Sequence, residues 1–376
     1  MSYRIGIDAR FFRKSTAGLG RYTRELLHGL AAIDSVNQYR VFITPSDLPE
    51  WDLAQPNFEP VVVPIAHYTV AEQTKFLQVL YKEKLDLVHF LNFNHPILYR
   101  RPFVVTLHDL TVLHFPQGRS QKSVIRRAGF VLAMKRAYSS AKAVIAVSES
   151  SAQDATKTLK IPQARMEVIY EGGPERLGEA PFGSKSQVQE FLGRREPYFF
   201  FLSAWRPHKG IATLVGAFER FKSETNAPHV LVLCGNQKYS TPELRERVAN
   251  SSFAADICLP GFVPDELLPL LYRHAVGTVN PSQYEGFGLP ILEAFAAGSP
   301  VISANNSSLP EVVGNAGILV ETGNEVAFAE AMYKLATDEA LRADLIAKGY
   351  TKLATFSWSQ MAKQTLGLYQ RVLEKP

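Results

Sequence analysis

The sequence contains little cysteine. Cys234 and Cys258 are the two cysteines in 376 residues, and they form no CxxC pair. No histidine cluster has the spacing of metal ligands, so the sequence supports neither a disulfide framework nor a zinc site. We therefore expect a protein of a reducing cytoplasm.

Long apolar runs are also missing. No stretch reaches about 18 uninterrupted apolar residues, the length from which a membrane-crossing helix is predicted. Met1, Ser2 and Tyr3 lead directly into RIGIDARFF, without the charged start and apolar core of a secretion signal. We expect neither secretion nor a transmembrane helix, and a membrane contact would be peripheral, on the cytoplasmic face.

The excess of one sign of charge is small. The net charge is +5 and the isoelectric point is near 9.0, which favours acidic partners such as phosphates or an anionic membrane face. No arginine-rich segment and no aromatic RNA-binding motif occurs, so nucleic acid is not an expected partner. The hydrophobic share of 46% and the charged share of 20% indicate a folded globular chain.

A chain of this length has room for two domains of roughly 150 to 200 residues each. Short apolar runs alternate with amphipathic stretches, which is typical of parallel strands joined by crossover helices. The first series of runs is RIGIDA, YRVFIT, LDLVHFL, FVVTLHD and AKAVIAVS, and the second is YFFFLSAW, HVLVLCG, DICLPGFV, AVGTVNPS, SPVISAN and GILV. The break between them predicts an α/β protein with two Rossmann-like domains, residues 1–175 and 190–357.

The end of the chain has the pattern of one more helix. Apolar residues recur along WSQMAKQTLGLYQRVLEK, from Trp358 to Val372, at spacings compatible with a helix face. We expect this helix to cross back, so that residues 358–376 join the first domain, because a second connection near the hinge suits two domains with a cleft between them. A helix that ends the second domain is the alternative.

The segment PSQYEGFGLPILEAFAAGSPVISA, residues 281–304, is the most informative part of the sequence. It follows an apolar run and predicts a strand, a glycine-rich turn and a helix. Gly286 and Gly288 allow a close approach of the backbone, and Pro290 suits the first turn of the helix. Amide groups at such a helix start, together with the helix dipole, favour binding of a diphosphate or of sugar hydroxyls.

Two carboxylates flank this turn. Glu285 stands before the glycines and Glu293 stands near the start of the helix. A carboxylate has two acceptor oxygens, so Glu293 suits the vicinal hydroxyls of a ribose and Glu285 suits hydroxyls of a second sugar. The alternative is that neither glutamate binds a ligand, one lying at a helix start and the other on the surface. The glycines between them favour the ligand-binding interpretation.

Further candidates follow two predicted strands. Arg206 and Lys209, in SAWRPHKG, lie on a turn after YFFFL, where their charges suit a diphosphate leaving group. His108 and Asp109 end the strand FVVTLHD, at the edge of the sheet where such folds bind their ligands. A solvent-facing basic turn and a structural histidine are the alternatives.

The segment TAGLGRYTREL resembles a dinucleotide fingerprint, but Thr23 occupies the place of the third glycine. No acidic residue stands about 20 residues further on, so an NAD enzyme is disfavoured. We interpret residues 17–20 as a loop that approaches donor phosphates or an acceptor, with an ordinary strand-to-helix turn as the alternative.

These motifs together resemble the retaining glycosyltransferases of family 4. The core of the resemblance is EGFGLPILE, which is similar to the E-x7-E element of that family, and AAGSPVISANNSSLPEVVGNAGILV continues it. The resemblance extends over nearly the whole chain. It implies the GT-B fold, in which two Rossmann-like domains face each other across a cleft and the carboxy-terminal helix crosses back to the first domain.

The resemblance also implies roles in donor binding. Glu293 would hold the donor ribose and Glu285 the transferred sugar, beside Gly286 and the backbone amides of Phe287 and Gly288. The remaining implied residues are Arg206 and Lys209 at the diphosphate, Leu289 and Pro290 at the phosphate end, His108 near the reactive centre of the sugar, and Gly18 in the amino-terminal loop.

Two positions depart from the family pattern. Ala17 precedes Gly18 where the family often has a second glycine, and the basic pair is separated as RPHK. The second departure makes Arg206 a weaker candidate than Lys209.

The implied reaction moves a hexose from a nucleotide sugar, which is a substrate, to a hydroxyl, with retention and without a metal or any other cofactor. We expect front-face attack, stabilised by the basic pair and the helix dipole, with Asp109 as the alternative nucleophile. WRPHKG and TLHDLT resemble family members that use GDP-mannose, so we expect a mannosyltransferase of polysaccharide biosynthesis. A UDP-hexose donor, for glucosyl or galactosyl transfer, is the alternative.

The acceptor is expected to be a saccharide or a lipid-linked saccharide at the first domain. The basic stretch 119–142 is interpreted as either an amphipathic membrane-surface helix or an ordinary domain helix. Two other classes fit the same architecture: an epimerase or phosphorylase, which would act without acceptor or require free phosphate, and a sugar-nucleotide sensor, which would never release nucleoside diphosphate.

Overall fold

The computed structural model describes residues 2–13, 17–116, 124–176 and 184–374, and the chain forms two compact units. The first unit comprises Met1–Gly172 and Ser357–Pro376, and the second comprises Gly173–Phe356. Within the described residues no helix is both long enough and apolar enough to cross a membrane.

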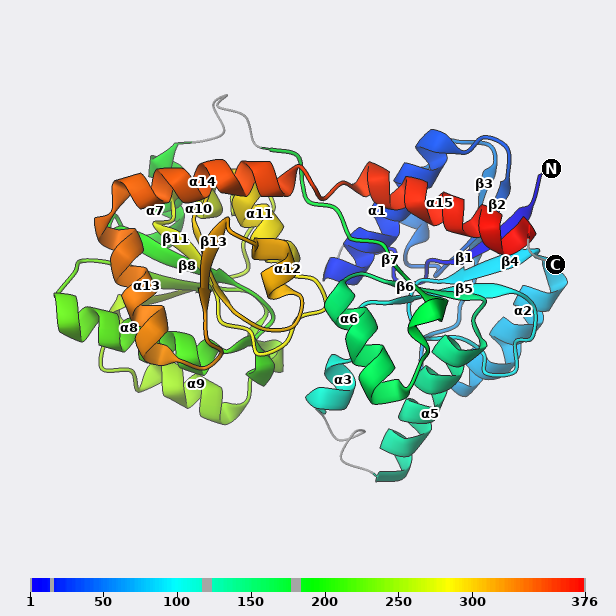
Figure 1. The fold of residues 1–376 in the computed structure, drawn as a ribbon, viewed down its shortest axis with the longest axis horizontal. Helices are drawn as coiled ribbons and strands as arrows, with labels where there is room; N and C mark the ends of the chain where they lie inside the picture. The colour runs from blue at the N-terminus through cyan, green and yellow to red at the C-terminus, as the bar shows by residue number, and fades with distance from the viewer. Residues whose placement is uncertain (1, 14–16, 117–123, 177–183, 375–376) are drawn as a thin grey trace. The chain divides into compact units, whose positions relative to one another are not determined.

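The described part of the first unit contains a parallel sheet with the strand order β3-β2-β1-β4-β5-β6-β7 (Figure 1). The central strands β4, β5 and β6 are buried along their whole length, as expected for a sheet with helices on both faces. The strands are β1 (Arg4–Asp8), β2 (Gln38–Ile43), β3 (Phe58–Val62), β4 (Leu87–Phe90), β5 (Phe103–Leu107), β6 (Ala143–Ala146) and β7 (Met166–Val168), and the helices are α1 (Ala17–Ile33), α2 (Leu77–Lys82), α3 (Thr111–His114), α5 (Val124–Ser140), α6 (Glu149–Asp154) and α15 (Trp358–Glu374).

The described part of the second unit repeats the arrangement with the strand order β10-β9-β8-β11-β12-β13, again all parallel. The strands are β8 (Tyr198–Leu202), β9 (Val230–Cys234), β10 (Ile257–Gly261), β11 (Gly277–Asn280), β12 (Val301–Ala304) and β13 (Gly317–Val320), and the helices are α7 (Lys185–Leu192), α8 (Ile211–Thr225), α9 (Pro242–Ala249), α10 (Leu268–His274), α11 (Leu289–Ala297), α12 (Leu309–Val313), α13 (Glu325–Thr337) and α14 (Glu339–Leu353). The predicted α/β class with two Rossmann-like domains is therefore confirmed.

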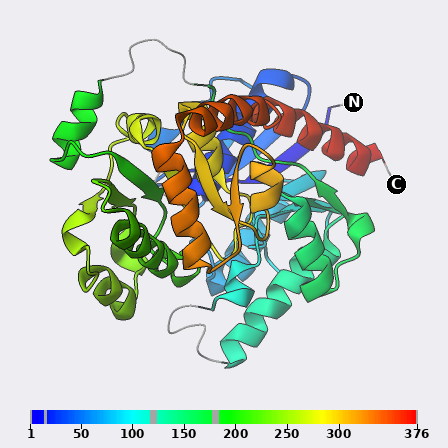
Figure 2. The ribbon, with the colours of Figure 1, turned by 60° about the vertical axis from the view of Figure 1, so that its left-hand side comes forward.

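The C-terminal helix belongs to the first unit, as expected from the crossing-back interpretation. α15 lies beside α1 (Figure 1, Figure 2). The two helices approach closely at Gly29, where an added Cβ atom would lie 2.5 Å from the Cβ atom of Ala362. The alternative, a helix that ends the second domain, is wrong.

A buried chain of hydrogen bonds also ties α15 to the sheet. The Tyr369 hydroxyl lies 2.5 Å from Nδ1 of His89, and Nε2 of His89 lies 2.8 Å from the Thr106 hydroxyl. The Thr106 hydroxyl lies 3.1 Å from the hydroxyl of Tyr22 on α1. Burial lowers the pKa of His89 to about 3, with a smaller contribution from His108, so the ring is neutral.

The interpretation of residues 17–20 as a loop is wrong, because α1 begins at Ala17. Gly18 and Gly20 therefore lie in the first turn of this helix. Thr23, the residue in the place of the third fingerprint glycine, is buried and donates its hydroxyl to the carbonyl of Leu19, one helical turn earlier.

Candidate active site

In the second unit, the loops after β8 and β11 bring together two of the predicted residues. Nζ of Lys209 lies 2.7 and 2.8 Å from the two carboxylate oxygens of Glu285. β8 and β11 are neighbours in a parallel sheet, so their carboxyl ends meet at the same edge. Both side chains are largely buried, with exposures of 17% for Lys209 and 14% for Glu285.

A glycine allows the two loops to touch. Gly210 has φ +71°, and an added Cβ atom would lie 2.1 Å from the carbonyl oxygen of Pro281. In the same region the backbone amide of Gln283 donates to the carbonyl of His208 at 2.7 Å. The close approach of the backbones, which needs glycine at this position, places Lys209 opposite Glu285.

Serine side chains hold Glu285 in place. The Ser282 hydroxyl donates to Oε1 of Glu285 at 2.7 Å, and the backbone amide of Glu285 donates to the Ser307 hydroxyl at 2.9 Å. The Ser308 hydroxyl donates to the carbonyls of Glu285 and Phe287. The carboxylate therefore has a fixed direction before any ligand binds.

The glycine-rich turn and its helix are formed as predicted. Gly288, with φ +115°, is the residue before α11, and Leu289 and Pro290 are its first two residues. Gly286 lies in the turn before them, and Phe287 is buried against Phe356, with 5.5 Å between the ring centroids. Glu285 and Pro290 line one small hollow at the carboxyl ends of the strands, together with Phe201, Leu202, Ser203, Thr278, Val279, Asn280, Ser282 and Ile291.

Glu293 lies one turn inside α11 and has another partner. The hydroxyl of Tyr272, on α10, donates to Oε2 of Glu293 at 3.0 Å. The Tyr272 ring is buried and packs edge-on against Phe200, with 4.9 Å between the ring centroids. The direction of this carboxylate is therefore set by a tyrosine anchored in the core.

The two predicted cations have different environments. Arg206 precedes a short 3-10 helix, Pro207–Lys209, and its guanidinium lies 4.7 Å from the centre of the Tyr239 ring. Lys209 is paired with Glu285 instead. Both residues lie on the predicted turn between β8 and α8, but their side chains meet different groups.

In the first unit, His108 and Asp109 follow β5 as predicted. Nδ1 of His108 lies 3.2 Å from Oε1 of Glu171, and Nε2 lies 2.9 Å from the Leu91 carbonyl oxygen. The edge of the Tyr22 ring packs against the imidazole at 4.7 Å between centroids. Because a carbonyl oxygen only accepts, Nε2 carries a hydrogen, and these three contacts fix the orientation of the ring.

Asp109 and Gly18 have simpler surroundings. Oδ1 of Asp109 accepts a hydrogen bond of 2.7 Å from the backbone amide of Thr111, where α3 begins. This carboxylate therefore supports a helix start. Gly18 is exposed in the first turn of α1.

Only part of the basic stretch 119–142 can be placed. Residues 119–123 lie outside the described residues, and Val124–Ser140 form α5. Phe130 and Val131 pack against the core of the first unit, Leu132 is 64% exposed, and Lys135 faces solvent. These contacts are those of a domain helix that also presents an apolar residue to solvent.

Three residues of these sites were missed from the sequence. Glu171 is 63 positions from His108, and Tyr272 is 21 positions from Glu293, so no local pattern connects them. Ser282 stands three residues before Glu285 in the same turn, so its hydrogen bond to the carboxylate could have been predicted from the sequence.

Comparison with known proteins agrees with this architecture. Residues 184–352 match the family described as Glycosyl transferases group 1, and residues 16–173 match Glycosyltransferase Family 4. The chain is 27% identical to O-antigen chain mannosyltransferase B of Escherichia coli, over 94% of this chain and 96% of that one. It is 30% identical to alpha-maltose-1-phosphate synthase of Mycolicibacterium smegmatis, over 73% of this chain and 74% of that one.

A solved structure gives the same fold. The Anabaena protein HepE, in complex with UDP-glucose, is similar with a TM-score of 0.75 and 18% identity, over 98% of this chain and 100% of that chain. The matched segments span both units, and each unit has the parallel sheet that the fold requires. The chain therefore belongs to glycosyltransferase family 4 and is a glycosyltransferase with the GT-B fold.

Proposed function

We propose that this glycosyltransferase transfers mannose from GDP-mannose to a hydroxyl of a saccharide or lipid-linked saccharide, with retention of the anomeric configuration. The observation that carries the proposal is the pairing of Lys209 with Glu285 at the carboxyl edge of the second sheet. The pair places an ammonium group, which suits a diphosphate, beside a carboxylate with two acceptor oxygens, which suits the hydroxyls of a sugar. The likeness to a mannosyltransferase over 94% of the chain supports the choice of sugar.

In this proposal, different residues of the second unit bind the ribose, the diphosphate and the transferred sugar of the donor. Glu293, oriented by Tyr272, accepts hydrogen bonds from the ribose hydroxyls, and Glu285 accepts them from the transferred sugar. Lys209 and Arg206 bind the diphosphate. The turn from Gly286 to Pro290, at the amino terminus of α11, adds the positive end of the helix dipole.

The first unit contributes the acceptor side and His108. The imidazole is held by Glu171 and the Leu91 carbonyl, and we assign it to the transferred sugar near its reactive carbon. Gly18, exposed at the start of α1, is assigned to the phosphate or acceptor side.

Catalysis proceeds by front-face attack. The acceptor oxygen forms a bond to the anomeric carbon as the bond from that carbon to the diphosphate oxygen breaks. The departing diphosphate takes the acceptor proton, and Lys209 and Arg206 offset its growing charge. Because the two cations stabilise the leaving group, the proposed reaction needs no metal. Asp109 supports the start of α3, which argues against its use as a nucleophile.

A UDP-hexose is the second candidate donor, favoured by the likeness in fold to a protein solved with UDP-glucose. Calorimetric titration with GDP, UDP and ADP in buffer containing EDTA separates the candidates. Selective binding of GDP supports GDP-mannose and metal-independent binding. Selective binding of UDP overturns the proposed donor, and binding of none of the three overturns the assignment of Arg206, Lys209 and Glu293.

Contact with an anionic membrane is proposed for α5 and the preceding basic residues, where a lipid-linked acceptor would be held. Leu132, exposed beside Lys135, supports this contact. Flotation with vesicles that contain anionic lipid at low salt tests it. Absence of binding would indicate a soluble acceptor.

A further inference from the structure

The second unit has a hollow of about 380 Å³ at the edge of its sheet where the strands begin. Tyr198, the first residue of β8, and Ala275 and Val276, which precede β11, line it. Lys209 and Glu285 follow the opposite ends of the same two strands. The hollow is therefore separate from the proposed donor site, and its volume is within the range of roughly 300–1,000 Å³ typical of small-molecule pockets.

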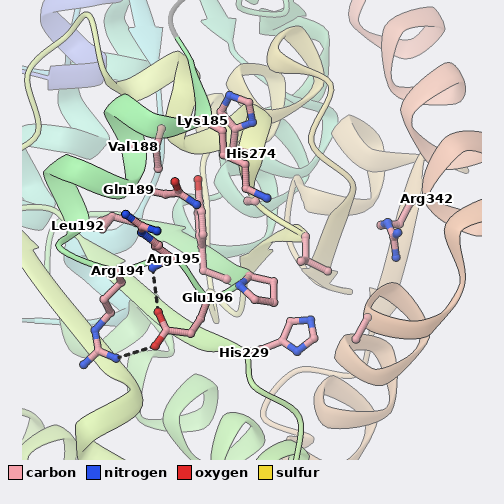
Figure 3. A pocket seen from close by; sticks show the side chains of 15 residues that line it. Lys185, Val188, Gln189, Leu192, Arg194, Arg195, Glu196, His229, His274 and Arg342 are labelled. Carbon is pink, nitrogen blue, oxygen red and sulfur yellow. Dashed lines mark hydrogen bonds and ion pairs between the residues drawn. The ribbon is translucent and has the colours of Figure 1, made fainter.

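Basic side chains surround this space. Figure 3 shows Lys185 near one end of it, Arg194 and Arg195 on one side with Glu196, and Arg342 on the other side. Four cations and one carboxylate thus line the space, and Arg342 is also paired with Glu339 at 3.1 Å. We call this site the basic hollow, defined by these five charged lining residues.

The carboxylate neutralises only part of the charge. Glu196 lies 3.9 Å from Arg194, which also donates to the Ala255 carbonyl, and Glu196 accepts a hydrogen bond of 2.9 Å from the backbone amide of Arg195. Within the part of the chain that the structure describes, the Lys185 ammonium and the Arg195 guanidinium have no ion-pair partner. These two groups are available to an anion.

Two histidines add unused hydrogen-bonding atoms. His229 is 8% exposed, and its buried Nδ1 has no hydrogen-bond partner. Nε2 of His274 is also buried and has no hydrogen-bond partner. Burial, followed by the charges of Lys222 and Arg342, lowers the pKa of His229 to about 4, so its ring is neutral. A neutral imidazole has one donor and one acceptor nitrogen.

Apart from Gln189 and Tyr198, the remaining lining is apolar. Val188 and Leu192 of α7 and Ala336 at the end of α13 contribute it. A bare inorganic ion would leave this surface uncovered, whereas the ring of a sugar would cover it. We propose that the basic hollow binds a phosphate monoester of a sugar or polyol, with its phosphate on the cations and its ring on the apolar floor.

A soluble sugar phosphate and a phosphoinositide headgroup share this chemistry, and two titrations distinguish them. Glucose 6-phosphate is titrated into the full chain by calorimetry in a Lys209→Ala background, which weakens binding at the proposed donor site. Vesicles of phosphatidylcholine that contain about 5% phosphatidylinositol phosphate, roughly one charged lipid in twenty, are titrated in parallel.

The test variant is Lys185→Ala with Arg195→Ala. Both residues are exposed, so the fold is expected to persist. We expect its affinity for whichever probe binds to fall about tenfold or more, equivalent to losing charge-assisted hydrogen bonds. The matched control is Arg220→Ala with Lys348→Ala, which removes the same charge from exposed positions of the same unit.

The outcomes separate this site from the donor site. Binding that is lost in the test variant and kept in the control supports the basic hollow, and the probe that binds identifies the source of the phosphate. Binding of neither probe, or equal loss in both double variants, overturns the proposal. GDP titration of the Lys185→Ala, Arg195→Ala variant in a chain that keeps Lys209 reports on the donor site alone, so a failure of either assignment is recognised separately.

Discussion

Lys209 and Glu285 neutralise each other before a donor arrives, and this has a consequence for each of them. The ammonium is held within 2.8 Å of both carboxylate oxygens, in a largely buried position. In the proposed donor site, a diphosphate must compete with Glu285 for Lys209, and sugar hydroxyls must compete with Lys209 for Glu285. A sugar nucleotide that supplies both groups at once replaces both halves of the pair, whereas a free phosphate replaces one.

Lys209→Ala is therefore expected to lower kcat by about 10²–10³, the range for loss of one preorganised electrostatic stabiliser. Glu285→Ala should have a similar effect, and the double variant should be much less impaired than the product of the two, because the residues act as one unit. Release of nucleoside diphosphate from the donor measures all three. The control is Lys348→Ala, and near-normal turnover of Lys209→Ala would remove Lys209 from the mechanism.

Tyr272 sets the direction of Glu293 through a single hydroxyl. Tyr272→Phe keeps the buried ring and removes the hydrogen bond to a charged group, worth about 1.5–3 kcal/mol. Part of this is regained from water, so we expect nucleotide affinity to fall about tenfold in calorimetry. Tyr333→Phe, on the exposed side of α13, is the control, and equal affinities would show that Tyr272 does not orient Glu293 for the proposed ribose contact.

At the scale of elements, the turn between β8 and α8 depends on Gly210. A side chain there would meet both an unfavourable φ and the Pro281 carbonyl at 2.1 Å. We expect Gly210→Ala to separate the two loops, to lower unfolding free energy by about 1–3 kcal/mol and to reduce turnover. Chemical denaturation and the transfer assay measure these effects.

Gly193 provides a matched control for this variant. It also has a positive φ, +63°, but an added Cβ would have no neighbour within 4 Å. Gly193→Ala should therefore cost about 1 kcal/mol and leave turnover unchanged. If the two variants lost the same stability and activity, the contact with Pro281 would not position the site.

Sequence patterns predicted the second sheet completely and the first sheet in part. The second series of apolar runs contains every strand of the order β10-β9-β8-β11-β12-β13. The first series lacks β3 and β7, the two edge strands. β3 contains Pro60, which argues against a strand in the middle of a sheet but is tolerated at an edge, and β7 has only three residues.

The same distinction applies to the site. Residues within one motif, such as Glu285 and Gly288, were found because their spacing carries the signal. Partners contributed by another element, such as Glu171 for His108, depend on the packing of the fold and leave no local pattern.

At the scale of the whole molecule, the buried His89 links folding to pH. Its pKa is lowered to about 3 in the folded state, against the ordinary value of 6.5, so the unfolded chain binds the proton more tightly. The stabilisation is complete above pH 6.5 and is lost as the pH falls toward 3. The free energy of unfolding should thus decrease by about 1.4 kcal/mol per pH unit for this residue between pH 5.5 and 4.5.

His89→Gln should remove this part of the pH dependence, as measured by urea unfolding at several pH values. His28→Gln, at an exposed position, should leave the slope unchanged. If His89→Gln does not fold, His95→Gln tests the same principle, because burial lowers the pKa of His95 to about 4. A slope that neither variant changes would contradict the linkage.

The chain passes between the two units twice, once after Gly172 and once after Phe356. The first unit therefore begins before the second unit in the chain but is completed after it. The face of α1 that receives Ala362 has no cover until residues 357–374 have been made, after the entire second unit. During synthesis this face of α1 therefore stays open to water until the second unit has been made, so the order of translation opposes early closure of the first unit.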